Sequence, residues 1–136
     1  MQSINLDSEP SHSLVKYRTH LEFAGYNIEE NEDSLACRHP RKPTLLLRHI
    51  DDRGVLVSTY FTLDKSIKRP LLLEFVNTLN TDFIFMKAYL DQENDLCLDT
   101  FFEGSYDRTN FSILLENIEY DVDILRKNSL TEHYLA

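Results

Sequence analysis

The chain has 136 residues, with 14 Lys and Arg against 23 Asp and Glu, giving a net charge of -9. A chain of this length suits one domain with one core. The negative charge repels phosphate backbones, so nucleic acid is disfavoured as a ligand, and basic or amphipathic proteins are the expected partners. The sequence contains no secretory h-region and no apolar run long enough to cross a bilayer. We therefore expect a soluble, cytoplasmic protein without a membrane partner.

The first part of the chain predicts an arm, a helix and a hairpin. Residues 1–12 are polar and are expected to form a mobile N-terminal arm. A helix is expected from Ser13, with apolar residues at helical spacing and Gly25 at its end. Residues 26–39 are typical of a loop or a short strand. Residues 44–50 and 55–63 then predict two strands joined by the turn Asp51–Gly54.

The second part predicts a helix, a hairpin and a long helix. Pro70 suits the first position of a helix whose end is expected near Asn80. Residues 83–91 and 95–103 predict two strands, and residues 107–127 a long amphipathic helix. The fold class is therefore α+β, an antiparallel sheet with packed helices in the order α-(β)-β-β-α-β-β-α. We expect one domain over residues 13–128 and a C-terminal tail over 129–136.

The register of the second hairpin follows from the chemistry of its faces. A three-residue loop with Asn94 in the left-handed conformation pairs Lys87 with Asp99 and Ala88 with Leu98, which keeps both faces coherent. The face that carries Lys87 and Asp99 is also rich in apolar residues. We predict that this face binds a second copy of the chain or another partner. Its predicted members are Leu56, Tyr60, Phe83, Phe85, Tyr89 and Phe101. An antiparallel sheet needs only one buried face, so a helix of the chain, a second copy or a bound client is expected to cover this one.

The polar motifs do not specify a cofactor or a metal. Asp91, Glu93 and Asp95 resemble half of a calcium loop, but the glycine and the last glutamate of such a loop are missing, so a solvated turn is predicted. Lys65, Lys68 and Arg69 before the second helix form either an anion clamp or a solvated connector.

Histidine and cysteine suggest one alternative to a binding protein. His49, close to Asp51 and Asp52, is the acid–base candidate for a small hydrolase or a metal-dependent enzyme. The alternative is that His49 is a structural strand residue beside a charged turn. Cys37 and Cys97 lack ligand spacing and are predicted to be buried, reduced thiols.

The segment from about Leu71 to Lys127 resembles a known family. Asn77 and Asn80 at a helix end, Tyr89 before an acidic turn with Asp91 and Asp95, and a closing amphipathic helix resemble the YbjN family, described as bacterial sensory transduction regulators. That family is similar in fold to type III secretion chaperones, which are small acidic dimers. The resemblance implies a non-enzymatic, dimeric, protein-binding regulator without a cofactor. From the residues alone, Asn80 is expected to end the helix in a left-handed conformation, with Asn77 satisfying backbone groups one turn earlier.

Overall fold

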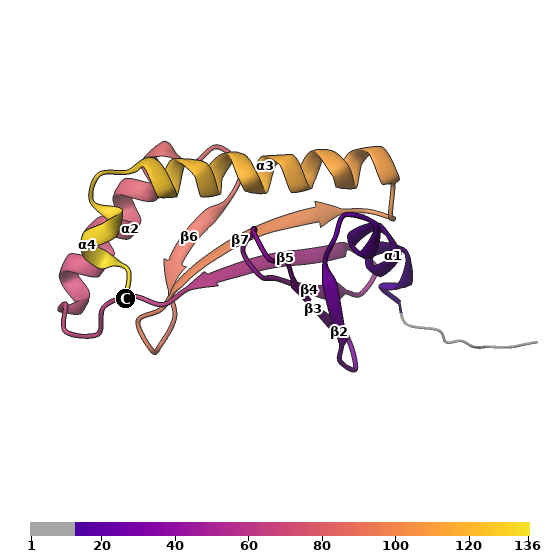
Figure 1. Ribbon diagram of the computed structural model, residues 1–136, viewed down its shortest axis with the longest axis horizontal. Helices are drawn as coiled ribbons and strands as arrows, with labels where there is room; N and C mark the ends of the chain where they lie inside the picture. The colour runs from indigo at the N-terminus through magenta and orange to yellow at the C-terminus, as the bar shows by residue number, and fades with distance from the viewer. Residues whose placement is uncertain (1–12) are drawn as a thin grey trace, which may run out of the picture. The chain divides into compact units, whose positions relative to one another are not determined.

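The computed structural model describes residues 13–136, so the expected N-terminal arm, residues 1–12, lies outside the described residues. The helices and strands follow the predicted order, and residues 26–39, which are typical of a loop or a short strand, form two strands (Figure 1). Their bounds are α1 Val15–Phe23, β2 Asn27–Glu30, β3 Ser34–Arg38, β4 Leu45–Ile50, β5 Gly54–Phe61, α2 Arg69–Asp82, β6 Lys87–Leu90, β7 Leu96–Glu103, α3 Arg108–Lys127 and α4 Thr131–Tyr134.

The strands form one six-stranded sheet in the order β2-β3-β4-β5-β7-β6. Its pairings are antiparallel, and the predicted α+β class is confirmed. Residues 26–39 supply a hairpin, because β2 pairs with β3 in a register that sets Ile28 opposite Cys37. By contact density the described chain separates into two compact units, and the strands β5 and β7 run from one into the other.

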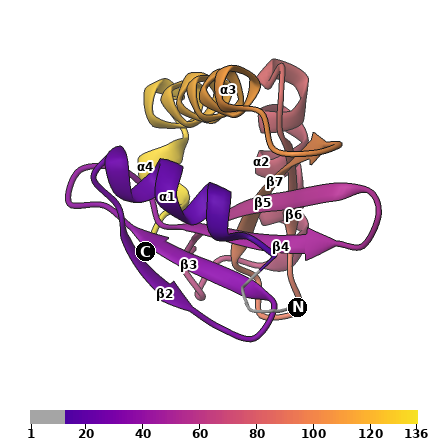
Figure 2. The ribbon, with the colours of Figure 1, turned by 90° about the vertical axis from the view of Figure 1, so that its right-hand side faces the viewer.

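Within the described residues, the first unit comprises residues 13–57 together with Phe101–Arg108. In it, α1 lies across the strands β2 and β3 (Figure 2). The ring of Tyr17 on α1 meets the ring of Phe102 edge-on, with centroids 5.9 Å apart. The fully or nearly buried apolar residues of this unit are Leu14, Leu21, Leu35, Cys37, Leu45, Leu47, Val55 and Val57. Each buried aliphatic side chain contributes about 1.5 to 3 kcal/mol to the free energy of unfolding.

The turn that opens β5 requires glycine for a spatial reason. Gly54 has φ +151°, and a Cβ atom at this position would lie 2.0 Å from the carbonyl oxygen of Phe102. Asp52 takes the left-handed conformation, with φ 61°. The predicted turn is therefore confirmed, and its glycine serves a close approach of backbone to backbone.

The second unit comprises Ser58–Thr100 and Thr109–Ala136. Figure 1 shows α3 as the long helix that runs over β6 and β7. The helix α2 begins with Pro70 in its first turn, where a missing N–H group costs nothing. The buried stripes of the two helices are Leu72, Phe75, Val76 and Leu79 on α2, and Phe111, Leu114, Ile118, Val122 and Leu125 on α3. These stripes recur at the spacing that places apolar residues on one face of a helix.

The segment expected as a C-terminal tail is ordered in this unit. It forms the short helix α4, whose Tyr134 ring stacks on Phe75 with centroids 4.5 Å apart. Leu135 forms an isolated bridge with Leu63.

The hairpin of β6 and β7 has the predicted register. Lys87 lies opposite Asp99 and Ala88 opposite Leu98, and Asn94 has φ 64°. The first strand is shorter than predicted, because it begins at Lys87 instead of Phe83. The helix before it is longer, since α2 continues to Asp82 and passes through Asn80.

Candidate functional site

One face of the β6–β7 hairpin combines exposed aromatic rings with a buried carboxylate. Directly opposed residues of an antiparallel pair share a face, so Lys87, Tyr89, Cys97 and Asp99 lie together. Tyr89 is 38% exposed and Tyr60 on β5 is 49% exposed, whereas Asp99 is only 6% exposed. We call these five residues the hairpin face.

The carboxylate of Asp99 is incompletely satisfied. The Tyr89 hydroxyl donates a hydrogen bond to it, and burial of that hydroxyl, with this bond, raises the pKa of Tyr89 far above its usual value. The Oδ1 atom of Asp99 has no hydrogen-bond partner among the described residues. Lys87, directly across the hairpin, places its Nζ atom 5.7 Å from the centre of the Tyr89 ring. A buried carboxylate oxygen without a donor is costly, which marks this position as unusual for a protein in isolation.

The six residues predicted for one partner-binding face do not all lie where the sequence placed them. Tyr60 and Tyr89 belong to the hairpin face. Leu56, half-buried on β5, and Phe101, 41% exposed on β7, belong to the first unit. The prediction that Phe83 and Phe85 lie on a strand is wrong, because both precede β6. Phe83 is the buried C-cap residue of α2.

Phe85 instead packs against the last long helix. Its ring meets Tyr120 of α3 edge-on, with centroids 5.8 Å apart. The reason lies in Asp121, which is fully buried and accepts hydrogen bonds from three successive backbone N–H groups. These are Ile84 at 3.1 Å to Oδ1, and Phe85 and Met86 at 2.8 Å each to Oδ2. The three bonds occupy N–H groups that a strand would otherwise use, so the strand begins only after Met86.

Asn80 has a different role from the predicted one. It is helical, and its side-chain amide bonds the backbone of Ala88 twice: Nδ2 donates to the carbonyl at 2.9 Å and Oδ1 accepts from the N–H at 2.8 Å. Because β6 is the last strand of the sheet, the amide supplies the partner that a further strand would have provided. Asn77 is exposed, and its carbonyl accepts a bond from the Thr81 hydroxyl. Ending the helix is therefore not the function of either amide.

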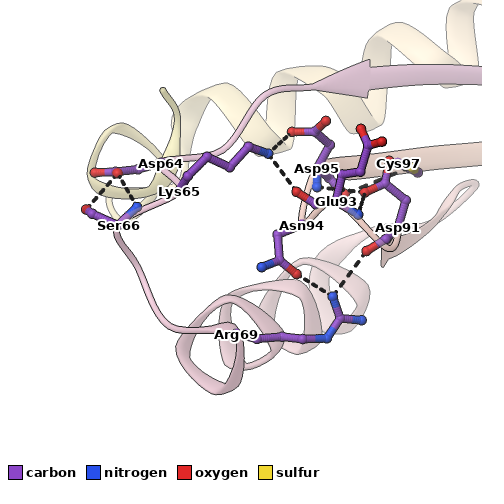
Figure 3. A network of polar contacts seen from close by, with 9 residues as sticks. All are labelled: Asp64, Lys65, Ser66, Arg69, Asp91, Glu93, Asn94, Asp95 and Cys97. Atoms are coloured by element: carbon purple, nitrogen blue, oxygen red, sulfur yellow. Dashed lines mark hydrogen bonds and ion pairs between the residues drawn. The ribbon is translucent and has the colours of Figure 1, made fainter.

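Two of the three cationic residues considered for an anion clamp form bonds within the protein. Lys65 donates to the Glu93 carbonyl at 2.9 Å and pairs with Asp95, and Arg69 donates to the Asp91 carbonyl at 3.1 Å and to Asn94 (Figure 3). These two cations hold the β6–β7 turn, so they are not available to clamp an anion as a pair.

The acidic turn holds its own backbone in the same way. Oδ1 of Asp91 accepts the N–H groups of Glu93 and Asp95, each at 2.9 Å. Within residues 13–136 no group of three or more His, Cys, Asp or Glu side chains could hold a metal ion. The turn is thus built by local hydrogen bonds, as expected for short polar turns.

The acid–base candidate lies at an open hollow of about 680 Å³ in the first unit. His49 and Asp52 line it, and Nδ1 of His49 lies 3.2 Å from a carboxylate oxygen of Asp51. The Asp51 side chain is 96% exposed. A catalytic imidazole is normally oriented by a buried carboxylate, which this pair does not provide.

Both cysteines are buried and reduced. Burial raises the pKa of the Cys37 thiol to about 12 and that of Cys97 to about 11, so both thiols are protonated and unreactive near neutral pH.

No helix in the described part of the chain is long and apolar enough to cross a membrane.

Comparison with known proteins identifies the relatives of this chain. Residues 16–123 match the family model YbjN, described as "Putative bacterial sensory transduction regulator". The chain is also similar to a solved structure, "Crystal structure of YbjN, a putative transcription regulator from E. coli". The TM-score is 0.71 at 17% identity, over 90% of this chain and 95% of that one, a likeness that concerns the fold. No curated protein matches. Because the family model spans most of the sequence, the chain belongs to the YbjN family.

Proposed function

We propose that this chain is a non-enzymatic regulatory protein that forms a homodimer through the hairpin face and binds a client protein, as secretion chaperones do. The observation that carries the proposal is Asp99. It is 6% exposed, and one of its oxygens has no hydrogen-bond partner among the described residues. The oxygen itself is buried, so a donor from a second molecule satisfies it once the Asp99 side chain turns outward on binding, which removes the cost of leaving it unpaired.

A second copy of the chain suits the charges of the face. Lys87 and Asp99 carry opposite charges on one surface, and in a twofold dimer each residue type contacts the other across the axis. Lys87 of one protomer would then pair with Asp99 of its partner, and the reverse. The rings of Tyr60 and Tyr89 supply the aromatic contact area typical of the centre of an interface.

The chain is expected to regulate by binding proteins rather than DNA. The solved relative is described as "a putative transcription regulator", and the family description names sensory transduction. A net charge of -9 opposes contact with the phosphate backbone, so regulation by this chain is best served by binding a protein. The predicted partner residues Leu56 and Phe101 remain candidates for the client contact.

Charge reversal tests the dimer. The molar mass in solution is measured by light scattering for the wild type, for Lys87→Glu, for Asp99→Lys and for an equal mixture of the two variants. We expect a dimer for the wild type and monomers for each variant, because each homodimer would place like charges together. The mixture should recover the dimer, since its two cross-pairs are both attractive.

Mixing separates contact between chains from repulsion within one chain. Lys87 and Asp99 face each other on one hairpin, so each reversal also places two like charges together inside the protomer. Mixing leaves that internal repulsion unchanged, and only an intermolecular pair responds to it. Lys68→Glu, an exposed position before α2, makes the same charge change away from the face and should leave the dimer intact. A wild type that is monomeric at its highest soluble concentration contradicts the proposal.

A further inference from the structure

An exposed apolar surface on the second unit lies where α2 turns into β6. Ile84 is 65% exposed, Phe85 43% and Tyr120 57%. The rings of Phe85 and Tyr120 are in edge-on contact. We call these three residues the apolar cluster. Three large apolar side chains in one place are more than the scattered single residues that any surface carries.

The backbone beneath this cluster is held rigidly. The fully buried carboxylate of Asp121 binds the N–H groups of Ile84, Phe85 and Met86 at 2.8 to 3.1 Å. A bond of the Thr100 hydroxyl to the Phe85 carbonyl, at 3.3 Å, fixes the segment from the other side. Bonds to a charged acceptor are stronger than neutral ones, so the exposed side chains project from an ordered segment. A surface that is ordered before binding loses less conformational entropy on binding.

Carboxylates border the cluster. A hollow of about 460 Å³ is lined by Asp82, Tyr120, Asp123, Ile124, Lys127 and Asn128. Asp123 pairs with Lys127 at 2.8 Å, with both side chains more than half exposed. Exposed pairs of this kind are weak and exchange readily with other charges. With a chain charge of -9, the border attracts positive side chains.

We propose that the apolar cluster binds a basic amphipathic segment of a partner protein. A large apolar side chain of that segment packs on Phe85 and Tyr120, and its Lys or Arg residues pair with Asp82 and Asp123. This is the helix-in-groove mode of recognition, in which apolar residues at helical spacing anchor the segment and charges select it. The apolar cluster shares no residue with the hairpin face, so this proposal does not depend on the dimer.

A designed peptide provides the test, because the chain contains no tryptophan. A helical peptide of Leu and Lys with one Trp reports binding through its own fluorescence when it is excited at a wavelength that the seven tyrosines of the chain do not absorb. A peptide in which Glu replaces Lys has the same apolar face and the opposite charge. We expect the Leu–Lys peptide to bind with a blue shift and saturation, and the Leu–Glu peptide to bind at least about ten-fold more weakly.

Alanine variants place the binding on the cluster. Phe85→Ala and Tyr120→Ala should each weaken the Leu–Lys peptide by about ten-fold or more, as expected for aromatic anchors. Phe23→Ala removes a 94% exposed ring from the first unit and should leave the affinity unchanged. Because all three side chains are exposed at the surface, the variants are expected to fold, and circular dichroism checks this.

Three results would overturn the proposal. These are a wild type that does not bind the Leu–Lys peptide, equal affinity for the two peptides, and binding that neither Phe85→Ala nor Tyr120→Ala weakens. If one of these two variants melts early, the other decides the outcome, since each removes one of the two rings in edge-on contact.

Discussion

The two ends of the strand β6 are held by opposite means. At the end near the turn, Lys65 and Arg69 reach the turn with exposed side chains, and Asp91 bonds its own neighbours (Figure 3). At the other end, a single buried carboxylate, Asp121, binds three backbone N–H groups. Exposed polar contacts compete with water and each contributes little, whereas a buried acceptor cannot be replaced by water when it is removed. The stability of the hairpin is therefore expected to depend on one end much more than on the other.

The difference between the two ends of β6 is tested most directly by removing the buried carboxylate of Asp121. Asp121→Ala leaves the N–H groups of Ile84, Phe85 and Met86 without their acceptor, and we expect the free energy of unfolding to fall by about 3 kcal/mol or more. Asp121→Asn keeps the shape, but it directs an NH₂ group at backbone donors and should lose about 2 kcal/mol. Urea unfolding followed by circular dichroism measures both.

A matched control lies two residues along the same helix. Asp123 carries an exposed carboxylate paired with Lys127, so Asp123→Asn should change the free energy of unfolding by less than about 0.5 kcal/mol. If Asp121→Asn and Asp123→Asn were equally stable, the buried carboxylate would not be what holds this end of β6.

The second test concerns the outer edge of the same strand. Asn80→Ala removes both bonds to the Ala88 backbone and should cost about 1 to 2 kcal/mol. Asn80→Asp keeps the acceptor for the Ala88 N–H but places a charge against the Ala88 carbonyl, so it should not restore the wild-type value.

Asn77→Ala is the control for the edge, because Asn77 is exposed on the same helix. It should be neutral or slightly stabilising, since Ala is the better helix former. Similar losses for Asn77→Ala and Asn80→Ala would contradict the role of Asn80 as a substitute strand.

The two ends of β6 also differ in how far they can be predicted from the sequence. The turn is local: Asn94 adopts the left-handed conformation that its own chemistry allows, and the register follows from the pairing of Lys87 with Asp99. The order of the predicted helices and strands likewise follows from local apolar periodicity. Local chemistry was therefore sufficient for the fold class and for this hairpin.

The other end depends on a residue far away in the chain. Asp121 lies more than thirty residues beyond the segment that it holds, and no local rule connects the two. A signal was present, because Asp121 stands on the apolar stripe of α3, three residues after Ile118 and four before Leu125, where a carboxylate requires donors. The same distant contact explains why the prediction of a strand at Phe85 is wrong. The apolar side chain of Phe85 fits a strand, but its backbone N–H group is already bound by Asp121.

The smallest effect is expected at the turn itself. Arg69→Ala removes bonds to the Asp91 carbonyl and to Asn94, all at exposed positions, so the free energy of unfolding should fall by less than about 1 kcal/mol. A local probe is available in Cys97, which lies opposite Tyr89 near this turn, while Cys37 lies in the first unit.

Thiol labelling at pH 8 can therefore detect loosening that unfolding experiments miss. Burial holds the pKa of both thiols well above this pH, so labelling requires the structure to open. We expect Arg69→Ala to accelerate labelling of Cys97 and to leave Cys37 unchanged, because only the turn end of β6 is loosened. Equal acceleration at both cysteines would mean that the turn contacts support the whole fold, and the contrast between the two ends of β6 would then be wrong.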